Sequence, residues 1–336
     1  MVSLNLKTSL LFVASALGAL VSAVPNPGTV TGNIAVHDPT LCRDGSGKYW
    51  LFSTGPGIEI RTSTDRIAWT LVGAVFPNGA ATWTNEYTGK NNGDLWAPDC
   101  YYQNGELLLY YAASSFGSQK SAIFLAKSSS GNPGTWSNLG LVTATTPSND
   151  YNAIDANLVI DNGQWYLSLG SFWTGIKMIN INSSTGKPSS SSLTSLARRT
   201  AAGGAIEAST IYKNGNFFYL FTSWDKCCSG TSSTYNIRVG RSSSVNGPYV
   251  DKSGVALTSG GGTLVLGSHD AVWFHNLCRF FAVLTALRTS QIIGPGGQDV
   301  YTDADGPILV YHHYTSSGSS LGINRLDFSS GWPVVV

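Results

Sequence analysis

The sequence predicts an all-β fold, and more narrowly a single-domain β-propeller of five blades. Helix periodicity is nearly absent from the 336 residues; short runs instead alternate apolar and polar residues and are rich in Tyr, Phe, Val, Ile and Trp. Turn-forming pairs separate these runs, namely Asp44-Gly45, Asn104-Gly105, Asn162-Gly163 and Asn214-Gly215. A repeat, which becomes visible when these turns are aligned, gives the number of blades.

Five segments share one pattern: an acid, a short strand, a turn at or near a glycine, and an aromatic strand. They read HDPTLCRDGSGKYWLFST, APDCYYQNGELLLYYAAS, AIDANLVIDNGQWYLSLGS, AIEASTIYKNGNFFYLFTS and GGQDVYTDADGPILVYHHY. Their acids are Asp38, Asp99, Asp155, Glu207 and Asp299, at intervals of 61, 56, 52 and 92 residues. A period of about 50 to 60 residues is typical of a propeller. The first strand of each blade then lines the channel, so acids distant in sequence converge at its mouth.

The last interval is too long for one blade. Residues 273 to 292, WFHNLCRFFAVLTALRTSQI, are apolar and contain no acid. We interpret them as an insertion foreign to the repeat, such as a retained intron in the gene model. An additional helix or loop that packs on the propeller is the alternative.

The chain begins with a pattern typical of a secretory leader. One lysine precedes an apolar run from Leu10 to Leu20, and Val21-Ser22-Ala23 resembles a cleavage site. This predicts a signal peptide over residues 1 to 23 and a mature domain over residues 24 to 336, secreted and without a membrane span. An uncleaved membrane anchor is the alternative, but the apolar run is short for one.

Composition favours a sugar over nucleic acid as the partner. The net charge is +1, only 12% of residues are charged, and no basic stripe suits a phosphate backbone. The 10 tryptophans and 15 tyrosines suit the flat faces of sugars, although secreted all-β proteins share this bias. No feature predicts an oligomer, so we expect a monomer.

Five cysteines in an oxidising compartment predict disulfides with at least one unpaired thiol. Their connectivity stays open, and the adjacent Cys227 and Cys228 can bond to each other or elsewhere. Asn182-Ser183-Ser184 is a predicted N-glycosylation site.

Two carboxylates on opposite sides of a glycosidic bond can hydrolyse it, one as general acid and the other as base or nucleophile. In this context five motifs, VHDPT, LWAPD, NAIDAN, AIEAS and GPGGQDV, carry a resemblance when taken in order. With GSHD and LVYHHY they resemble the family 43 glycoside hydrolases and, within that family, the fungal arabinan endo-1,5-α-L-arabinosidases. The resemblance spans essentially the whole mature chain apart from residues 273 to 292.

The resemblance implies a five-bladed propeller that hydrolyses α-1,5-linked arabinan, a side chain of pectin, with inversion. It implies that Asp38 is the general base, Glu207 the general acid, and Asp155 the acid that raises the pKa of Glu207 and orients it. Pro39 is expected to hold Asp38 in an extended backbone. Asp99 and Asp299 receive no catalytic role, and we expect them to be structural hydrogen-bond acceptors.

Further residues are expected to contact the sugar. Trp96 and Phe116 are predicted to stack on arabinose rings, Asn152 and Ser171 to bond hydroxyl groups, and His37 to contact substrate or support Asp38. Phe172 and Trp173 are additional stacking candidates.

The chemistry needs no cofactor, but related arabinanases place a metal ion in the channel. The resemblance therefore makes a calcium or sodium ion a candidate for the channel of this chain. Many bacterial relatives read GPGH where this chain has Gly297, which leaves the metal ligand unknown. His37, His269, His312 and His313 are the histidines that remain for it.

Two other functions fit part of the pattern. Exo-acting arabinofuranosidases and β-xylosidases share the scaffold and the three acids, but this chain carries no appended β-sandwich of the kind many xylosidases have. A non-catalytic sugar-binding propeller would keep the aromatic residues without needing all three acids. The insertion also raises the alternative of an inactive chain, because it falls near the predicted channel.

Overall fold

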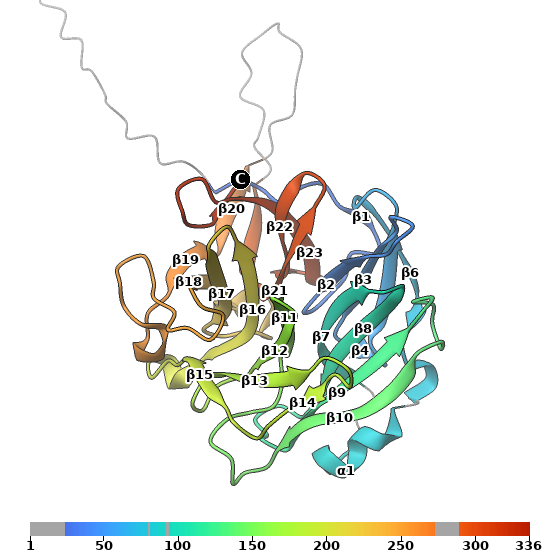
Figure 1. Cartoon of the computed structure of the whole chain (residues 1–336). Coiled ribbons are helices and arrows are strands. Elements are labelled where there is room, and N and C mark those ends of the chain that lie inside the picture. The colour runs from blue at the N-terminus through green and yellow to red at the C-terminus, as the bar shows by residue number, and fades with distance from the viewer. Residues whose placement is uncertain (1–23, 80, 92–93, 273–288) are drawn as a thin grey trace, which may run out of the picture.

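Five β-sheets surround a central axis in the computed structural model, and each forms one blade (Figure 1). The structure describes residues 24–79, 81–91, 94–272 and 289–336. The prediction of an all-β, five-bladed propeller is confirmed. Within these ranges no helix combines the length and the apolar character needed to cross a membrane.

Each blade is built mainly from consecutive antiparallel strands. Blades 1 and 2 comprise β2 (Thr40–Arg43), β3 (Tyr49–Ser53), β5 (Glu59–Ser63) and β6 (Ala68–Ala74), then β7 (Asp94–Gln103), β8 (Glu106–Ala113), β9 (Ser121–Ser128) and β10 (Ser137–Thr145). Two short strands join their edges: β1 (Thr31–Gly32) pairs with β6, and β4 (Gly55–Pro56) pairs with β7. Helix α1 (Asn85–Thr88) lies between the two blades in sequence.

The other three blades follow in chain order. Blade 3 has β11 (Asn157–Asp161), β12 (Gln164–Leu169) and β13 (Ile176–Asn182), with β14 (Lys187–Pro188) and β15 (Thr194–Ala197) both paired to β13. Blade 4 has β16 (Ile206–Asn214), β17 (Phe217–Trp224), β18 (Asn236–Ser242) and β19 (Thr263–Leu266). Blade 5 has β20 (His269–Val272), β21 (Thr289–Asp303), β22 (Gly306–Thr315), β23 (Gly318–Asp327) and β24 (Val334–Val335).

The predicted turns join the first two strands of their blades. Asn104-Gly105 and Asn162-Gly163 have positive φ at both residues, which matches the right-handed twist of paired strands. Gln103 pairs with Glu106 across the first of these turns. The sequence repeat therefore marks the inner hairpin of each blade.

The core consists of apolar layers between neighbouring blades. The layer that closes the ring joins Leu41, Leu51 and Trp69 of blade 1 to Ile308 and Val310 of blade 5, all of them buried. The N-terminal segment crosses this junction: Gly28 N–H donates to the Ile323 carbonyl, and Leu321 N–H donates to the Ile34 carbonyl. Apolar burial and these hydrogen bonds hold the first and last blades together.

The predicted signal peptide and most of the predicted insertion, residues 273–288, lie outside the described residues. The last four residues assigned to the insertion belong to β21. Val272 and Thr289, which flank residues 273–288, are directly paired between β20 and β21. The described part of the predicted insertion therefore forms a regular strand of blade 5.

Two disulfides settle connectivities that the sequence left open. Cys42 of β2 bonds Cys100 of β7, which links blades 1 and 2, and Cys227 bonds its neighbour Cys228. Cys278 lies outside the described residues. Asn182 is exposed at the end of β13, where its side-chain oxygen accepts hydrogen bonds from Ser184.

Candidate active site

One backbone conformation recurs at the inner end of all five blades. Asp38, Ala97, Asp155, Ala208 and Gly297 occupy equivalent positions and have φ values of 45°, 38°, 58°, 51° and 55°. The expectation of an extended backbone at Asp38 is therefore wrong. Pro39 does restrict the residue before it, but the turn that brings each chain into the channel requires a left-handed residue, and this geometry overrides the local preference.

The residues that lie two positions after these five left-handed residues form a belt of side chains around the channel. Asp299 accepts the Leu41 N–H at 2.9 Å, Thr40 accepts the Cys100 N–H at 3.2 Å, and Asp99 accepts the Leu158 N–H at 2.8 Å. Asn157 continues the belt by accepting the Ile211 N–H at 2.9 Å. Asp99 and Asp299 are thus structural acceptors between blades, as predicted. Burial raises the pKa of both acids, and the charge of Asp299 raises that of Asp99 further.

A groove lies across the channel mouth and consists of two adjoining depressions. The Asp38 half has a volume of about 500 Å³ and the Trp173 half about 560 Å³. Trp96, Phe116, Ile154, Glu207 and Cys227 line both halves. The structure brings all of the predicted catalytic and substrate-binding residues to this groove: His37, Asp38, Trp96, Phe116, Asn152, Asp155, Ser171 and Glu207.

Asp38 is held by three side chains from blades 1 and 5. Its Oδ2 accepts hydrogen bonds from His37 Nδ1 at 2.9 Å and from the Thr54 hydroxyl at 2.8 Å. Its backbone N–H donates to His312 Nδ1 at 3.1 Å, so Nε2 carries the proton of this buried imidazole. Burial opposes ionisation of Asp38, but the positive field of His37 and its hydrogen bond lower the pKa of the carboxyl below its ordinary value.

Glu207 lies on the opposite blade with two hydrogen-bond donors. The Ser171 hydroxyl donates to Oε2 at 2.7 Å, and the Tyr235 hydroxyl donates to Oε1 at 2.8 Å. These bonds favour the ionised form, yet burial outweighs them and, with the nearby charge of Asp38, raises the pKa of Glu207. The groove therefore contains an acid whose pKa is lowered, Asp38, and an acid whose pKa is raised, Glu207.

Asp155 lies beside Glu207 and shares its electrostatic environment. Its Oδ2 accepts the Ala208 N–H at 2.9 Å, and Ala208 directly follows Glu207. Burial and the charge of Glu207 raise the pKa of Asp155 well above its ordinary value. Asp155 and Glu207 do not readily ionise at the same time, because each charge opposes the other. The pair therefore retains one proton at pH values where an isolated acid would lose it.

The sequence analysis gave four of the supporting residues no part in holding the catalytic acids. Thr54, Tyr235, His312 and Tyr314 each contact Asp38, Glu207 or His37. His312 and Tyr314 belong to the YHHY motif, which did signal this site. Thr54 and Tyr235 have no such motif, because they come from loops that follow β3 and precede β18.

Aromatic side chains and one unpartnered amide line the groove walls. The Trp96 and Phe116 rings lie 5.5 Å apart, and Phe116 is 79% exposed, so its face is open to a ligand. Phe172 and Trp173 line the Trp173 half, where both have a left-handed backbone. Asn152 is buried, and its Oδ1 has no hydrogen-bond partner among the described residues. Stacking on aromatic rings and hydrogen bonding to buried amides are common in sugar recognition.

The described residues form no oxygen-rich set of ligands of the kind that calcium prefers. His37, Asp38 and His312 form the one group of potential ligands found among the described residues, with ligand atoms within 4.8 Å. Two of these three residues offer imidazole nitrogens, which already have hydrogen-bond partners, whereas calcium prefers six to eight oxygens. A Cβ at Gly297 would collide with Asp38 and His312, so a histidine does not fit there either. Hydrolysis by two carboxylates and water needs no metal or other cofactor.

The fold and the groove define the class. A propeller that presents an ionised and a protonatable carboxyl group at the mouth of its channel has the acid–base arrangement of a glycoside hydrolase. The family model described as "Glycosyl hydrolases family 43" matches residues 28–333. The chain therefore belongs to glycosyl hydrolase family 43.

Relatives extend over nearly the whole chain. "Extracellular endo-alpha-(1->5)-L-arabinanase 1" of Bacillus subtilis is 42% identical over 341 residues, covering 97% of each chain. "Probable arabinan endo-1,5-alpha-L-arabinosidase A" of Aspergillus flavus is 40% identical over 331 residues, covering 94% of this chain and 96% of the relative. The crystal structure of an exo-1,5-α-L-arabinanase from a bovine ruminal metagenomic library superposes with a TM-score of 0.77 at 33% identity, covering 90% of this chain and 97% of that one.

Proposed function

We propose that this chain is a secreted endo-1,5-α-L-arabinanase that hydrolyses internal bonds of arabinan with inversion and acts as a monomer. The observation that carries the proposal is the groove, which continues on both sides of Glu207. A chain that cleaves internally needs sugar-binding surface on both sides of the scissile bond. The names of the Bacillus and Aspergillus relatives supply the substrate and the bond.

The three acids divide the reaction as follows. Asp38, whose pKa is lowered, takes a proton from water as that water attacks the anomeric carbon. Glu207, whose pKa is raised, gives its proton to the departing oxygen. The leaving sugar then occupies the Trp173 half, because Glu207 lines that half and Asp38 does not. Asp155 retains a proton in common with Glu207, so that when Asp155 is the ionised member its negative charge favours the proton on Glu207. Its bond to the Ala208 N–H orients the residue that follows Glu207.

Early products from debranched arabinan test the endo mode. Mixed oligosaccharides that precede free arabinose are the expected result, and proton NMR of the first turnover should show the inverted anomer. Arabinose as the sole early product would instead support exo action, which the similar exo-acting structure makes the main alternative.

Paired variants test the roles of the acids. Glu207→Gln should abolish arabinan hydrolysis but spare much of the hydrolysis of an arabino-oligosaccharide with a 4-nitrophenyl leaving group, which departs without a proton. Asp38→Asn should abolish both, because water activation is required in each case. Equal losses on both substrates in Glu207→Gln would contradict the assignment of the general acid. Complete retention of arabinan hydrolysis would favour a role in sugar binding alone.

Residues 273–288 can be tested as a foreign segment. Because Val272 and Thr289 are paired, an Asn-Gly turn can replace the segment and close the β20–β21 hairpin. We expect the shortened chain to hydrolyse arabinan at least as fast as the full chain. A spliced transcript that encodes residues 273–288, together with loss of activity on shortening, would contradict this.

Secretion and glycosylation complete the proposal. The leader pattern over residues 1–23 and the extracellular name of the Bacillus relative support export. Exposure of Asn182 supports its modification. Mass spectrometry of the exported protein should find a mature N-terminus after Ala23 and glycan on Asn182.

A further inference from the structure

The disulfide between adjacent cysteines lies at the boundary between the two halves of the groove. Cys227 lines both halves, and Cys228 lines the Asp38 half. Both belong to the loop that connects β17 to β18, in which Cys227 is half-buried and Cys228 is exposed with a φ of 61°. A structural bond that only stabilised the fold would be expected inside a blade junction, where Cys42 and Cys100 are buried.

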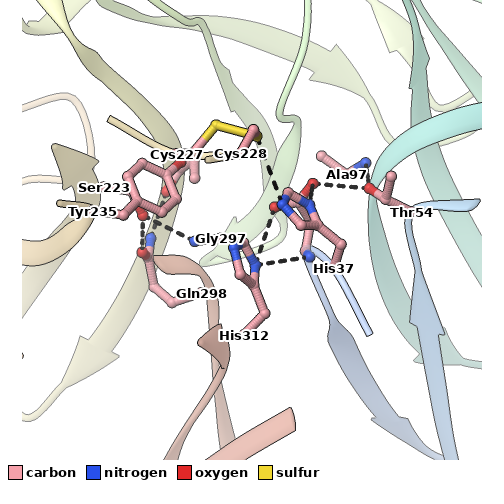
Figure 2. A network of polar contacts seen from close by, with 12 residues as sticks. His37, Thr54, Ala97, Ser223, Cys227, Cys228, Tyr235, Gly297, Gln298 and His312 are labelled. Carbon is pink, nitrogen blue, oxygen red and sulfur yellow. Dashed lines mark hydrogen bonds and ion pairs between the residues drawn. A yellow bond between two sulfur atoms is a disulfide. The ribbon is translucent and has the colours of Figure 1, made fainter. Parts of the chain in front are cut away.

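Cys228 contacts the residues that support Asp38. Its backbone N–H donates to the Tyr314 hydroxyl at 2.8 Å, and its Sγ lies 3.7 Å from His37 Nε2. Figure 2 shows the disulfide beside His37, with the contact from Cys228 to this ring drawn as a dashed line. His37 is also stacked on His312, with ring centroids 3.9 Å apart, so its ring has neighbours on several sides.

The hydrogen bonds at Tyr314 have a defined direction. His312 Nε2 carries a proton, because its Nδ1 accepts the Asp38 N–H, and it therefore donates to the Tyr314 oxygen at 3.1 Å. Cys228 N–H donates to the same oxygen, so two donors fill its lone pairs. The Tyr314 O–H is then directed at His37 Nε2, 3.0 Å away. In neutral His37, this places the ring proton on Nδ1, which donates it to Asp38.

We propose that the Cys227–Cys228 disulfide is a positioning element of the active site: it fixes the Cys228 N–H on Tyr314 and thereby the orientation of His37, which holds Asp38. Bonding adjacent cysteines closes a ring that includes their shared peptide, which removes backbone freedom from the loop. Without the bond, the Cys228 N–H can leave Tyr314. The Tyr314 hydroxyl then rotates, and His37 loses its fixed partner.

The test compares two double variants of the full chain, C227S/C228S and, as the matched control, C42S/C100S. The first should lower kcat/KM for arabinan roughly tenfold, a loss typical of a displaced catalytic group, mainly through kcat. It should also change the ring ¹⁵N shifts of His37, identified by the signal that disappears in His37→Gln. The control should lower thermal stability and leave both the His37 shifts and kcat unchanged.

The inference rests on the proposed function for its kinetic half only, because the His37 spectrum is recorded without substrate. If the wild-type chain does not cleave arabinan, the proposed function fails, and the spectra still decide whether the disulfide fixes His37. Unchanged His37 shifts in C227S/C228S, or changed shifts with wild-type kcat, would overturn the inference. Should that variant not fold, mild reduction of the wild-type chain opens the exposed disulfide before the buried one, as alkylation mapping can verify, and the same two readouts apply.

Discussion

Asp38 and Asp155 occupy equivalent positions in two blades, each with a left-handed backbone at the inner end of the blade. The other three blades have Ala97, Ala208 and Gly297 there. The site is therefore built on a position whose conformation the fold imposes five times, and acidic side chains are added at two of them. Aspartate tolerates this conformation better than most residues, so the fold bears little additional strain for the two carboxylates.

Gly297 should be essential because of the space that Asp38 and His312 occupy beside it. In Gly297→Ala, the added Cβ collides with both side chains, so we expect Asp38 to move and kcat to fall at least about tenfold. Gly215→Ala is the matched control, because Gly215 has a φ of +57° but open space around its position. It should show only the cost of a left-handed alanine, about 1 kcal/mol of unfolding free energy, with normal kcat. Equal kinetics in the two variants would contradict the packing argument.

Tyr235→Phe should move the pH profile towards alkaline pH. The Tyr235 hydroxyl donates to Glu207 and stabilises its ionised form, so its removal raises the pKa of Glu207 further. The general acid must be protonated, and activity is lost as pH rises through its pKa. The alkaline limb of kcat/KM should therefore shift up by about one pH unit, the equivalent of one charge-assisted hydrogen bond. Tyr212→Phe, which breaks an exposed bond to Thr302, should leave the limb in place.

Asp155→Asn should shift the same limb in the opposite direction. Asparagine keeps an acceptor for the Ala208 N–H and is favoured in a left-handed backbone, so the geometry is retained while the negative charge is removed. Without that charge Glu207 releases its proton at lower pH, and activity at neutral pH should fall by about 10² or more. Kinetics from pH 4 to 8 measure this directly. A limb that stays in place or rises would show that Asp155 does not set the pKa of Glu207.

The sequence predicts the blades better than it predicts the equivalence of their acids. Five acids begin five similar segments, because each segment begins with the strand that enters the channel. The alignment by acids nevertheless treated Asp99 as the equivalent of Asp38. In the structure Asp99 occupies the position equivalent to Thr40, and Ala97 occupies the position equivalent to Asp38. Aligning Asp38-Pro39 with Ala97-Pro98 would have revealed this shift.

The supporting residues could not be predicted in the same way. Cys228 lies in a loop of blade 4 but contacts His37 of blade 1 and Tyr314 of blade 5. Such contacts depend on how blades meet around the axis, which no local pattern encodes. Tyr235 lies in the same loop and reaches Glu207 within blade 4, and no motif in its own segment indicates this contact. The adjacent cysteines were visible in the sequence, but their bond and its position beside His37 required the structure.

Asp99→Asn should change how stability depends on pH. Burial and the charge of Asp299 raise the pKa of Asp99 above its unfolded value near 4. An acid with a raised pKa contributes stability that is fully present below the unfolded pKa and is lost as pH rises towards the folded pKa. The variant loses one acceptor for Asn157 or Leu158, so at pH 4 it should be less stable than the wild type by about 1 kcal/mol. It does not share the loss at higher pH, so this deficit should shrink or reverse by pH 8. Urea unfolding at pH 4, 6 and 8 measures the difference.

Asp44→Asn is the control of opposite sign. Hydrogen bonds from Ser46, Trp50 and Lys48 outweigh burial and lower the pKa of Asp44. The stability deficit of this variant should therefore grow as pH rises from about 3. A deficit for Asp99→Asn that is constant with pH would contradict the buried acid pair as the cause.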